Sequence, residues 1–492
     1  MVIAGYGYAG GIAAIEAHDA GAQVILVEKA SHYGGNSMVS GGGVVTAKDP
    51  EKALRYLEAT NAGRTPRDVN WAMAQGLCEL EEYLRWLIEG LDPPVELEPY
   101  DHEAHGATYP FPGGETLTNI KLKPIPGFSG YPWAVGLRAG ARLFKVVAEN
   151  VERRKIAAYY NTAAERLITD DSGSVVGLLA RQANQQVKVL ARRAVVLATG
   201  GFEWDESMKK QYFEIPVFPV CTPTNTGDGV RMAQAVGAAL WHMWHFHGGY
   251  GFKFPEFPFA FRHCFRGPRK PRFRMPWIAV DKYGARFMNE YPPAVQDTGA
   301  RPLAYFDADR QEYPRIPCYL IFDESGRKLG PLADTIINTE EYRYQWSEDN
   351  SVEIDCGWIK KANSIPELAK IFAMEPSVLT ATVDRWNKFF RQRKDEEYGR
   401  QPSTMMAIEE PSFYAVESWP IVTNTQGGPV HDAISGSRLR PLYCQEHCPE
   451  LPDTMAPELG EEDYCLRCGI RRGDYWERKA RALAARLGEP LP

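Results

Sequence analysis

Residues 1–29 have the sequence MVIAGYGYAGGIAAIEAHDAGAQVILVEK, and this stretch decides the fold. An apolar strand, VIAG (2–5), enters the glycine loop GYGYAG (5–10), which has the spacing GxGxxG. Good helix formers follow in GIAAIEAHDA (11–20), and QVILVEK (23–29) is a second apolar strand with an acid near its end. A strand, a glycine turn, a helix and an acidic strand end together predict a Rossmann-like domain that binds a dinucleotide.

The residues of the glycine loop have separate physical roles. Gly5 makes the tight turn, Gly7 lets a pyrophosphate approach the backbone, and Gly10 lets the helix pack closely on the strand. The phosphates then lie at the helix N-terminus, where free N–H groups favour anions. Glu28, 23 residues after Gly5, is placed to accept hydrogen bonds from ribose hydroxyls. We expect the neighbouring residues of the loop and the strand end to share the site: Tyr8, Ala9 and Lys29.

Three further turns extend the predicted site beyond what a simple NAD domain needs. SHYGGNSMVSGGGV (31–44) follows the acidic strand, ARRAVVLATGGF (191–202) is a buried strand entering a turn, and NTGDGVRMAQAVGA (225–238) opens a helix. Their backbone donors and hydroxyls suit a long ligand, although the acid that opens the last helix can also act as its N-cap. The cofactor-binding residues predicted from these turns are Gly35, Asn36, Ser37, Ser40, Gly41, Gly42, Ala198, Thr199, Gly200 and Asp228.

Composition excludes several classes of protein. The chain has 492 residues, too many for one core at about 100–200 residues per domain, and its 44% apolar and 24% charged residues are ordinary for a globular protein. A net charge of -7 leaves no basic surplus for nucleic acid. No apolar run reaches the roughly 20 residues that span a bilayer, and the opening lacks the basic segment of a signal peptide. Nine cysteines do not make a disulfide framework, so we expect a cytoplasmic protein with reduced thiols.

Together these segments resemble the flavoprotein family of fumarate reductase, succinate dehydrogenase and the ketosteroid dehydrogenases. The resemblance extends from Val2 to about Val430 and includes GARFMNE (284–290), YLIFDESGRK (319–328) and NTQGGP (424–429). It implies an α/β fold, in which a Rossmann-like FAD-binding domain carries an inserted α+β capping domain. The implied bounds are 1–245 for the first part of the FAD-binding domain, 246–424 for the capping domain and 425–492 for the C-terminal return.

The resemblance also implies the reaction. In this family hydride passes between flavin N5 and the carbon β to a carbonyl or carboxylate, while a proton moves at the α carbon. Arg327 lies where the fumarate reductase branch has its proton-donating arginine, and Glu290 is the matching candidate for reloading it. The tyrosines of the ketosteroid dehydrogenases have no counterpart between Asp323 and Leu329. A salt-bridged arginine on a turn is the structural alternative for Arg327.

Departures from the family pattern concern the flavin link and the substrate. Asn36 stands where succinate dehydrogenase has the histidine that binds flavin covalently, so we expect noncovalent FAD. The family's His-Thr-x-Gly-Gly, which holds a dicarboxylate, corresponds to the predicted substrate-binding residues Asn424, Thr425, Gly427 and Gly428. Because the histidine is lost and aromatic residues crowd positions 244–265, we expect a larger, less charged enone. The histidines at 242, 245 and 247 have no acid or cysteine at ligand spacing, so no metal is predicted there.

Two local patterns predict helices of the capping domain without reference to the family. SIPE (364–367) is a capping box, with Ser364 as the N-cap and Glu367 three residues later. Apolar residues recur at helical spacing in the next helix, which predicts that they face the core: Leu379, Val383, Trp386 and Phe390.

The tail after residue 432 departs from the family, because the expected Gly-Glu and Gly-Gly-Asn segments are not recognisable. Cys444, Cys448, Cys465 and Cys468 instead form CxxxC and CxxC pairs that suit a tetrahedral zinc knuckle. Three interpretations stay open: a tail held by zinc, a divergent tail with free thiols, or a shifted reading frame, which the abrupt loss of resemblance favours.

The sequence therefore predicts an FAD-dependent oxidoreductase acting on the CH–CH group next to a carbonyl, by enone or enoate reduction or by ketone dehydrogenation. The alternative is a flavin-binding protein with little or no turnover, because the segment that completes the flavin site is altered. The partners expected are a small-molecule substrate and an electron donor or acceptor whose class the sequence leaves open, with no nucleic acid and no membrane.

Overall fold

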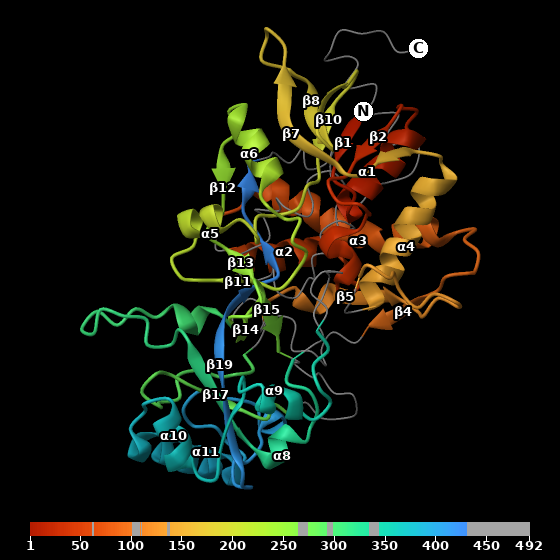
Figure 1. The fold of residues 1–492 in the computed structure, drawn as a ribbon. Coiled ribbons are helices and arrows are strands. Elements are labelled where there is room, and N and C mark those ends of the chain that lie inside the picture. The colour runs from red at the N-terminus through yellow and green to blue at the C-terminus, as the bar shows by residue number, and fades with distance from the viewer. Residues whose placement is uncertain are drawn as a thin grey trace.

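The computed structural model describes residues 1–61, 63–100, 109, 111–134, 138–263, 274–292, 299–333 and 344–430. These residues form two parts stacked along the long axis of the molecule (Figure 1). One part contains the N-terminal strands with helices α1 to α4, and the other contains helices α8 to α11. The cysteines of the predicted zinc site lie outside the described residues. Within the described ranges, no helix combines the length and the apolar character that crossing a membrane requires.

A parallel sheet in the order β10-β1-β2-β6 forms the centre of the N-terminal part. Its strands are β1 (Val2–Ala4), β2 (Ile25–Val27), β6 (Ala157–Tyr159) and β10 (Val195–Leu197). Helix α1 (Tyr8–Asp19) connects β1 to β2, and its residues Tyr8 to Ile15 are buried. Because β1 and β2 are parallel and adjacent, this unit is the βαβ crossover that the opening sequence predicts.

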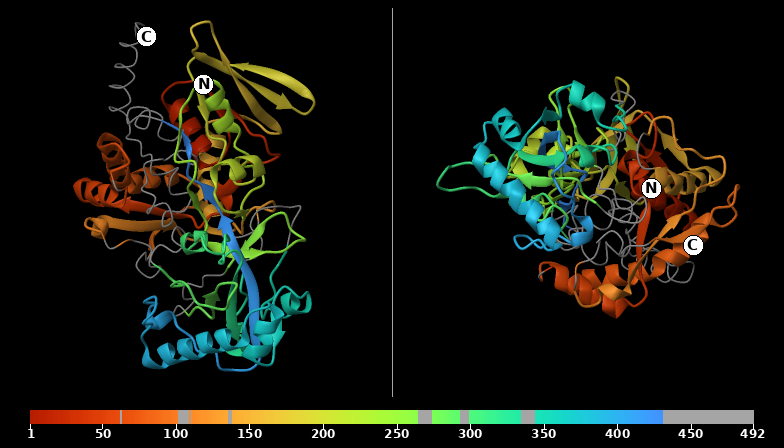
Figure 2. Two further views of the ribbon diagram at one scale, coloured as in Figure 1. Left: turned by 90° about the vertical axis from the view of Figure 1, so that its left-hand side faces the viewer. Right: turned by 90° about the horizontal axis from the view of Figure 1, so that it is seen from below.

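Helices and small sheets surround the parallel sheet. The helices are α2 (Pro50–Asn61), α3 (Arg67–Ile88), α4 (Arg138–Arg153), α5 (Glu206–Tyr212) and α6 (Asp228–Ala235), with the 3-10 turn η1 (Gly35–Val39). One antiparallel sheet contains β3 (Gly43–Ala47), β4 (Leu97–Tyr100) and β5 (Leu117–Leu122). A second contains β7 (Thr162–Thr169), β8 (Val175–Gln182) and β9 (Gln185–Leu190), and it projects from the end of the molecule (Figure 2).

The other part is built on a mostly antiparallel sheet in the order β15-β14-β19-β17-β16, with β11 and β18 also paired to β19. Its strands are β11 (Phe218–Pro219), β14 (Tyr250–Lys253), β15 (Ala260–Arg262), β16 (Ile278–Val280), β17 (Cys318–Asp323), β18 (Lys360–Ala362) and β19 (Phe413–Val422). Its helices are α8 (Glu324–Arg327), α9 (Ser351–Asp355), α10 (Ile365–Ile371) and α11 (Pro376–Gln392). Helices packed on an antiparallel sheet confirm the predicted α+β capping domain.

The capping domain also confirms both local predictions. The Ser364 hydroxyl accepts a hydrogen bond from the Glu367 amide, and the Glu367 carboxylate accepts one from the Asn363 amide. On α11, Leu379, Val383 and Trp386 are buried in the core between this helix and the sheet, and Phe390 is half-buried against that core.

The two parts are joined where the outgoing and returning chains pair. Strand β12 (Leu240–Trp241) pairs with β21 (Gly428–Pro429), and β13 (Phe246–His247) pairs with β20 (Asn424–Thr425). The predicted domain bounds lie in these paired segments. Residues far apart in sequence therefore meet at the junction, directly beside the glycine-rich turns.

Candidate FAD and substrate site

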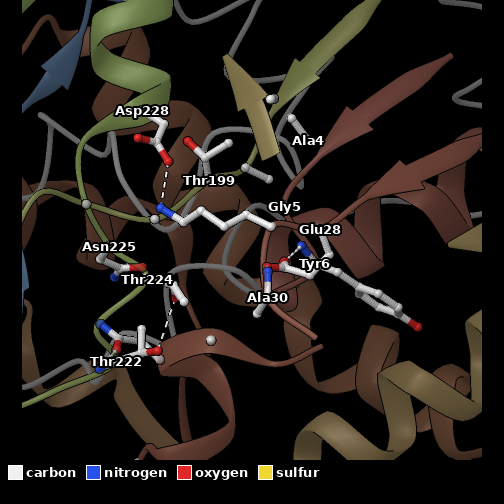
Figure 3. A pocket seen from close by; sticks show the side chains of 18 of the residues that line it. Ala4, Gly5, Tyr6, Glu28, Ala30, Thr199, Thr222, Thr224, Asn225 and Asp228 are labelled. Atoms are coloured by element: carbon white, nitrogen blue, oxygen red, sulfur yellow. Dashed lines mark hydrogen bonds and ion pairs between the residues drawn. The ribbon is translucent and has the colours of Figure 1, made fainter. Parts of the chain in front are cut away.

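A cavity that opens to solvent lies beyond the C-terminal ends of β1, β2 and β10 (Figure 3). Ligands of open parallel sheets bind at this edge. The predicted site residues that line the cavity are Gly5, Gly7, Glu28, Lys29, Gly35, Asn36, Ala198, Thr199, Gly200, Asp228 and Asn424. The structure thus brings four separate glycine-rich or polar turns to one place.

Two positions of the first loop have room for glycine only. Gly5 has a φ of +99°, and a Cβ atom there would lie 1.8 Å from the Ala198 carbonyl oxygen. A Cβ atom at Gly10 would lie 1.9 Å from the Gly5 carbonyl oxygen. Gly7 is the N-cap of α1 and has no side chain to cap its first turn. The Tyr8 amide donates to Ser37 Oγ, and the absence of a side chain at Gly7 lets a phosphate group approach the rest of the helix N-terminus.

Glu28 and Lys29 form the floor of the cavity at the end of β2. The Glu28 carboxylate accepts hydrogen bonds of 2.8 Å from the amides of Tyr6 and Ala30. Burial raises the pKa of Glu28, and these amides lower it by a smaller amount. Each carboxylate oxygen keeps acceptor capacity for ribose hydroxyls, which is the predicted role.

The Lys29 ammonium group closes one side of the cavity. Its Nζ lies 2.7 Å from Asp228 Oδ2 and 2.7 Å from Thr226 Oγ1, as Figure 3 shows for Asp228. The N-cap of α6 is Gly227, and Asp228 is the first residue of the helix. Asp228 therefore pairs with a lysine at the cavity instead of capping the helix.

Other predicted cofactor residues do not line the cavity but form hydrogen bonds and contacts behind it. Ser37 Oγ accepts a hydrogen bond of 3.0 Å from the Tyr8 amide, and Ser40 Oγ donates to the Ser37 carbonyl at 2.7 Å. The Tyr8 hydroxyl donates to the Gly140 carbonyl at 2.7 Å. A Cβ at Gly42 would meet Ala139 at 2.4 Å, so this turn packs against α4. The remaining predicted residues that do not line the cavity are Ala9, Gly10 and Gly41.

Asn36 and Asn424 lie where the second loop meets the returning chain. Asn36 Oδ1 accepts a hydrogen bond of 2.9 Å from the Thr222 amide, and its Nδ2 donates to the Thr423 carbonyl at 3.1 Å. Asn424 Oδ1 is 2.9 Å from His247 Nδ1. Since Oδ1 can only accept, this contact places the proton on His247 Nδ1.

The other three predicted substrate residues do not line the cavity. Thr425 Oγ1 accepts a hydrogen bond of 3.2 Å from the Phe202 amide. Gly427 lies against Met243, and Gly428 pairs with Trp241 in the β12–β21 ladder. Their positions fix the returning chain beside the cavity.

The predicted catalytic pair is not brought together. Arg327 forms a two-point ion pair with Glu324 and also contacts Asp349, on a short helix at the end of the capping domain farther from α1 (Figure 1). Glu290 is fully buried within the capping domain and pairs with Arg286 and Arg400. Neither residue lines the cavity. Their catalytic role stays a prediction, and their contacts favour structural roles.

The sequence analysis does not predict several of the residues that line the cavity. Tyr6, Thr162, Thr222, Thr224 and Asn225 line it, as does the fully buried Glu203. A usable signal was present in CTPTNTGDG, where hydroxyl and amide side chains directly precede the predicted helix start. Glu203 directly follows the ATGGF turn, but a single acid there is not distinctive without the structure.

These residues fit FAD, because two glycines leave no room for a side chain, Gly7 lets a phosphate group approach the helix N-terminus, and Glu28 is placed for a ribose. When bound, FAD supplies the site for hydride exchange. The residues of the cavity lining would hold the dinucleotide.

Comparison with known proteins agrees with this geometry. A family model described as "FAD binding domain" matches residues 1–435. The chain is 26% identical to a 3-oxosteroid 1-dehydrogenase of Mycolicibacterium smegmatis over 89% of both chains. It is 27% identical to a fumarate reductase (cytochrome) of Shewanella frigidimarina, over 88% of this chain and 67% of the relative.

Among solved structures, the 3-ketosteroid delta1-dehydrogenase of Sterolibacterium denitrificans matches with a TM-score of 0.75 at 20% identity, covering 98% of this chain and 99% of that one. This likeness shows a shared fold. The family match and the relatives do not favour a flavin-binding protein without turnover. The chain belongs to the FAD binding domain family, and it is an FAD-dependent oxidoreductase that acts on a CH–CH group next to a carbonyl or carboxylate.

Proposed function

We propose that the protein dehydrogenates the Cα–Cβ bond of a neutral cyclic ketone. The observation that supports this substrate class is the neutral polar surface around Asn424. Three other residues of the cavity lining, Asn36, Thr222 and Asn225, carry amides and a hydroxyl. Lys29, the lysine of the described lining, is paired with Asp228. A C4 dicarboxylate would require cationic partners for both of its carboxylates.

Asn424 has a defined role in this proposal. Its Oδ1 accepts a hydrogen bond from His247 Nδ1 at 2.9 Å, whereas the Thr423 hydroxyl donates to the His247 carbonyl at 2.8 Å. The bond to His247 orients the side-chain amide, so that its N–H groups are the end assigned to a substrate oxygen. A neutral donor suits a ketone oxygen and stabilises the charge that develops there as the α proton leaves.

The relatives support a cyclic ketone. They include 3-oxosteroid 1-dehydrogenases and the 4-oxocyclohexanecarboxylate 2-dehydrogenase of Sinomonas cyclohexanicum, whose named substrate is a cyclic ketone that also carries a carboxylate. This second relative is 26% identical over 88% of this chain and 84% of the relative. An acrylate reductase and a fumarate reductase define the competing class, an anionic enoate.

Anaerobic mixing with a substrate panel tests the proposal. The FAD-loaded protein should lose its visible flavin absorbance with a 3-oxosteroid or a substituted cyclohexanone, and the product should lack two hydrogens. Asn424→Ala should lower kcat/KM for the ketone by about 10²–10³-fold, whereas Asn184→Ala, in an exposed turn, should not. If no ketone bleaches the flavin, and fumarate or acrylate reoxidises the reduced protein, the substrate is an enoate.

A further inference from the structure

Glu203 is a buried acid at the cavity whose carboxylate is only partly satisfied. It follows the turn Gly200–Gly201 and lines the cavity, yet it is 0% exposed. Its Oε1 lies 3.4 Å from Asn225 Nδ2 and 3.5 Å from Asn36 Nδ2. Its Oε2 has no hydrogen-bond partner among the described residues. Burying a carboxylate oxygen without a hydrogen-bond partner costs free energy. We therefore expect Oε2 either to contact a bound ligand or to carry a proton.

Oε2 lies close to the backbone of a residue that lines the cavity. A Cβ atom on Gly201, which also lines the cavity, would lie 2.8 Å from Oε2. Asn36, the second neighbour of the carboxylate, belongs to the second glycine-rich loop and also lines the cavity. Glu203 is thus enclosed by two of the turns that the sequence assigns to FAD.

The charged groups around Glu203 do little to stabilise its ionised form. On α5, the Lys209 ammonium group donates to the Val217 carbonyl and pairs with Glu206. Asp205, the N-cap of α5, pairs with Arg231. The other acidic and basic side chains of the cavity lining are those of Lys29, which pairs with Asp228, and of Glu28 and His32.

The returning strand β20 presents Asn424, bonded to His247 of β13, and Thr425. Burial raises the pKa of Glu203 to about 7, against smaller lowering effects of the backbone N–H groups of Glu203 and Thr425, the Asn225 amide and Lys209. The carboxyl is therefore poised to change charge near neutral pH.

We propose that protonation of Glu203 is coupled to FAD binding, and that Glu203 is a neutral carboxylic acid when the site holds the dinucleotide. The FAD diphosphate brings negative charge into a cavity that already contains Glu28 and Asp228. A further charge on Glu203 opposes this, so FAD binding takes up a proton and the affinity for FAD falls as pH rises. The inference rests on the FAD site and is independent of the substrate proposed above.

The test measures binding instead of turnover. FAD is removed from the wild-type protein, and its dissociation constant is measured by flavin fluorescence between about pH 6 and pH 8.5. We expect the dissociation constant to rise about tenfold across this range, the effect of a pKa difference of about one unit between the free and bound states. Glu203→Gln keeps the shape of the side chain without its titration, and its dissociation constant should be nearly independent of pH. Glu165→Gln, exposed on β7, should retain the wild-type profile.

A second measurement needs no variant. Mixing wild-type apoprotein with FAD in weak buffer near pH 7 should take up a substantial fraction of one proton per FAD bound, reported by a pH indicator dye. The inference is overturned if wild-type protein takes up no proton, or if Glu203→Gln retains the wild-type pH dependence, which would assign it to Glu28 or another group. Failure of the ketone panel leaves both results unaffected.

Discussion

Replacement of Glu290 by glutamine distinguishes a structural acid from the proton relay that the family resemblance implies. The carboxylate accepts four hydrogen bonds. Oε1 accepts from Arg286 Nε at 2.8 Å and the Ala279 amide at 3.0 Å, and Oε2 accepts from Arg286 Nη2 at 2.8 Å and Arg400 Nη1 at 3.2 Å. In either orientation, a glutamine side chain would point its NH₂ group at two donors.

Glu290 belongs to a buried cluster with Arg286, Asp395 and Arg400, and the charge balance of this cluster sets the size of the expected loss of stability. Arg286 and Arg400 are balanced by Glu290 and Asp395, and all of these side chains are buried. Glu290→Gln leaves one guanidinium charge without compensation in the protein interior. Breaking a buried pair by removing one partner costs about 3–5 kcal/mol. At about 2–4 °C per kcal/mol for a domain of this size, the midpoint of thermal unfolding should fall by roughly 6–20 °C.

Tryptophan fluorescence is a suitable assay. The guanidinium carbons of Arg286 and Arg400 lie 4.7 Å and 5.0 Å from the ring centre of Trp386, so disruption of the cluster changes the surroundings of this ring. Glu417→Gln, on the exposed face of β19, is the matched control and should change stability by no more than about 0.5 kcal/mol. Wild-type stability together with lost turnover in Glu290→Gln would refute the structural role and support the relay.

Three further substitutions separate local effects. Gly10→Ala would place a methyl group 1.9 Å from the Gly5 carbonyl oxygen and should reduce FAD retention on desalting, whereas Asn184→Ala, in an exposed turn, should retain FAD. Arg327→Ala removes partly exposed ion pairs, so the free energy of unfolding should fall by no more than about 1 kcal/mol. The rate of flavin reduction should stay close to that of the wild type. A fall of two orders of magnitude in that rate would establish the catalytic role. Burial raises the pKa of Glu16 from 4.5 to about 7, although the hydrogen bond from Tyr83 lowers it by a smaller amount. The contribution of Glu16 to stability is therefore present below pH 4.5 and is lost as pH rises through 7. Glu16→Gln should flatten that part of the stability profile measured by urea unfolding, and an unchanged slope would contradict the assignment.

The sequence by itself determined the elements whose signals are local. The β1–α1–β2 unit follows from Gly5 and Gly10, because only glycine fits the close approach of the loop to β10 and of α1 to the loop. The capping box at Ser364 likewise lies within four residues. These constraints involve short-range backbone geometry, which residue types and spacing specify directly.

Only the tertiary structure decided which polar side chains share an environment. Ser37 and Ser40 belong to a ligand-like loop, yet their hydroxyls bond to the protein behind the cavity. Glu290 follows the family pattern and pairs with the neighbouring Arg286, but Arg400, 110 residues away, also binds its carboxylate. Glu203 has a raised pKa because it is buried where its own turn meets the turns of Asn36 and Asn225. Charge, burial and hydrogen-bond satisfaction depend on residues distant in sequence, and for that reason they appear only once the chain has folded.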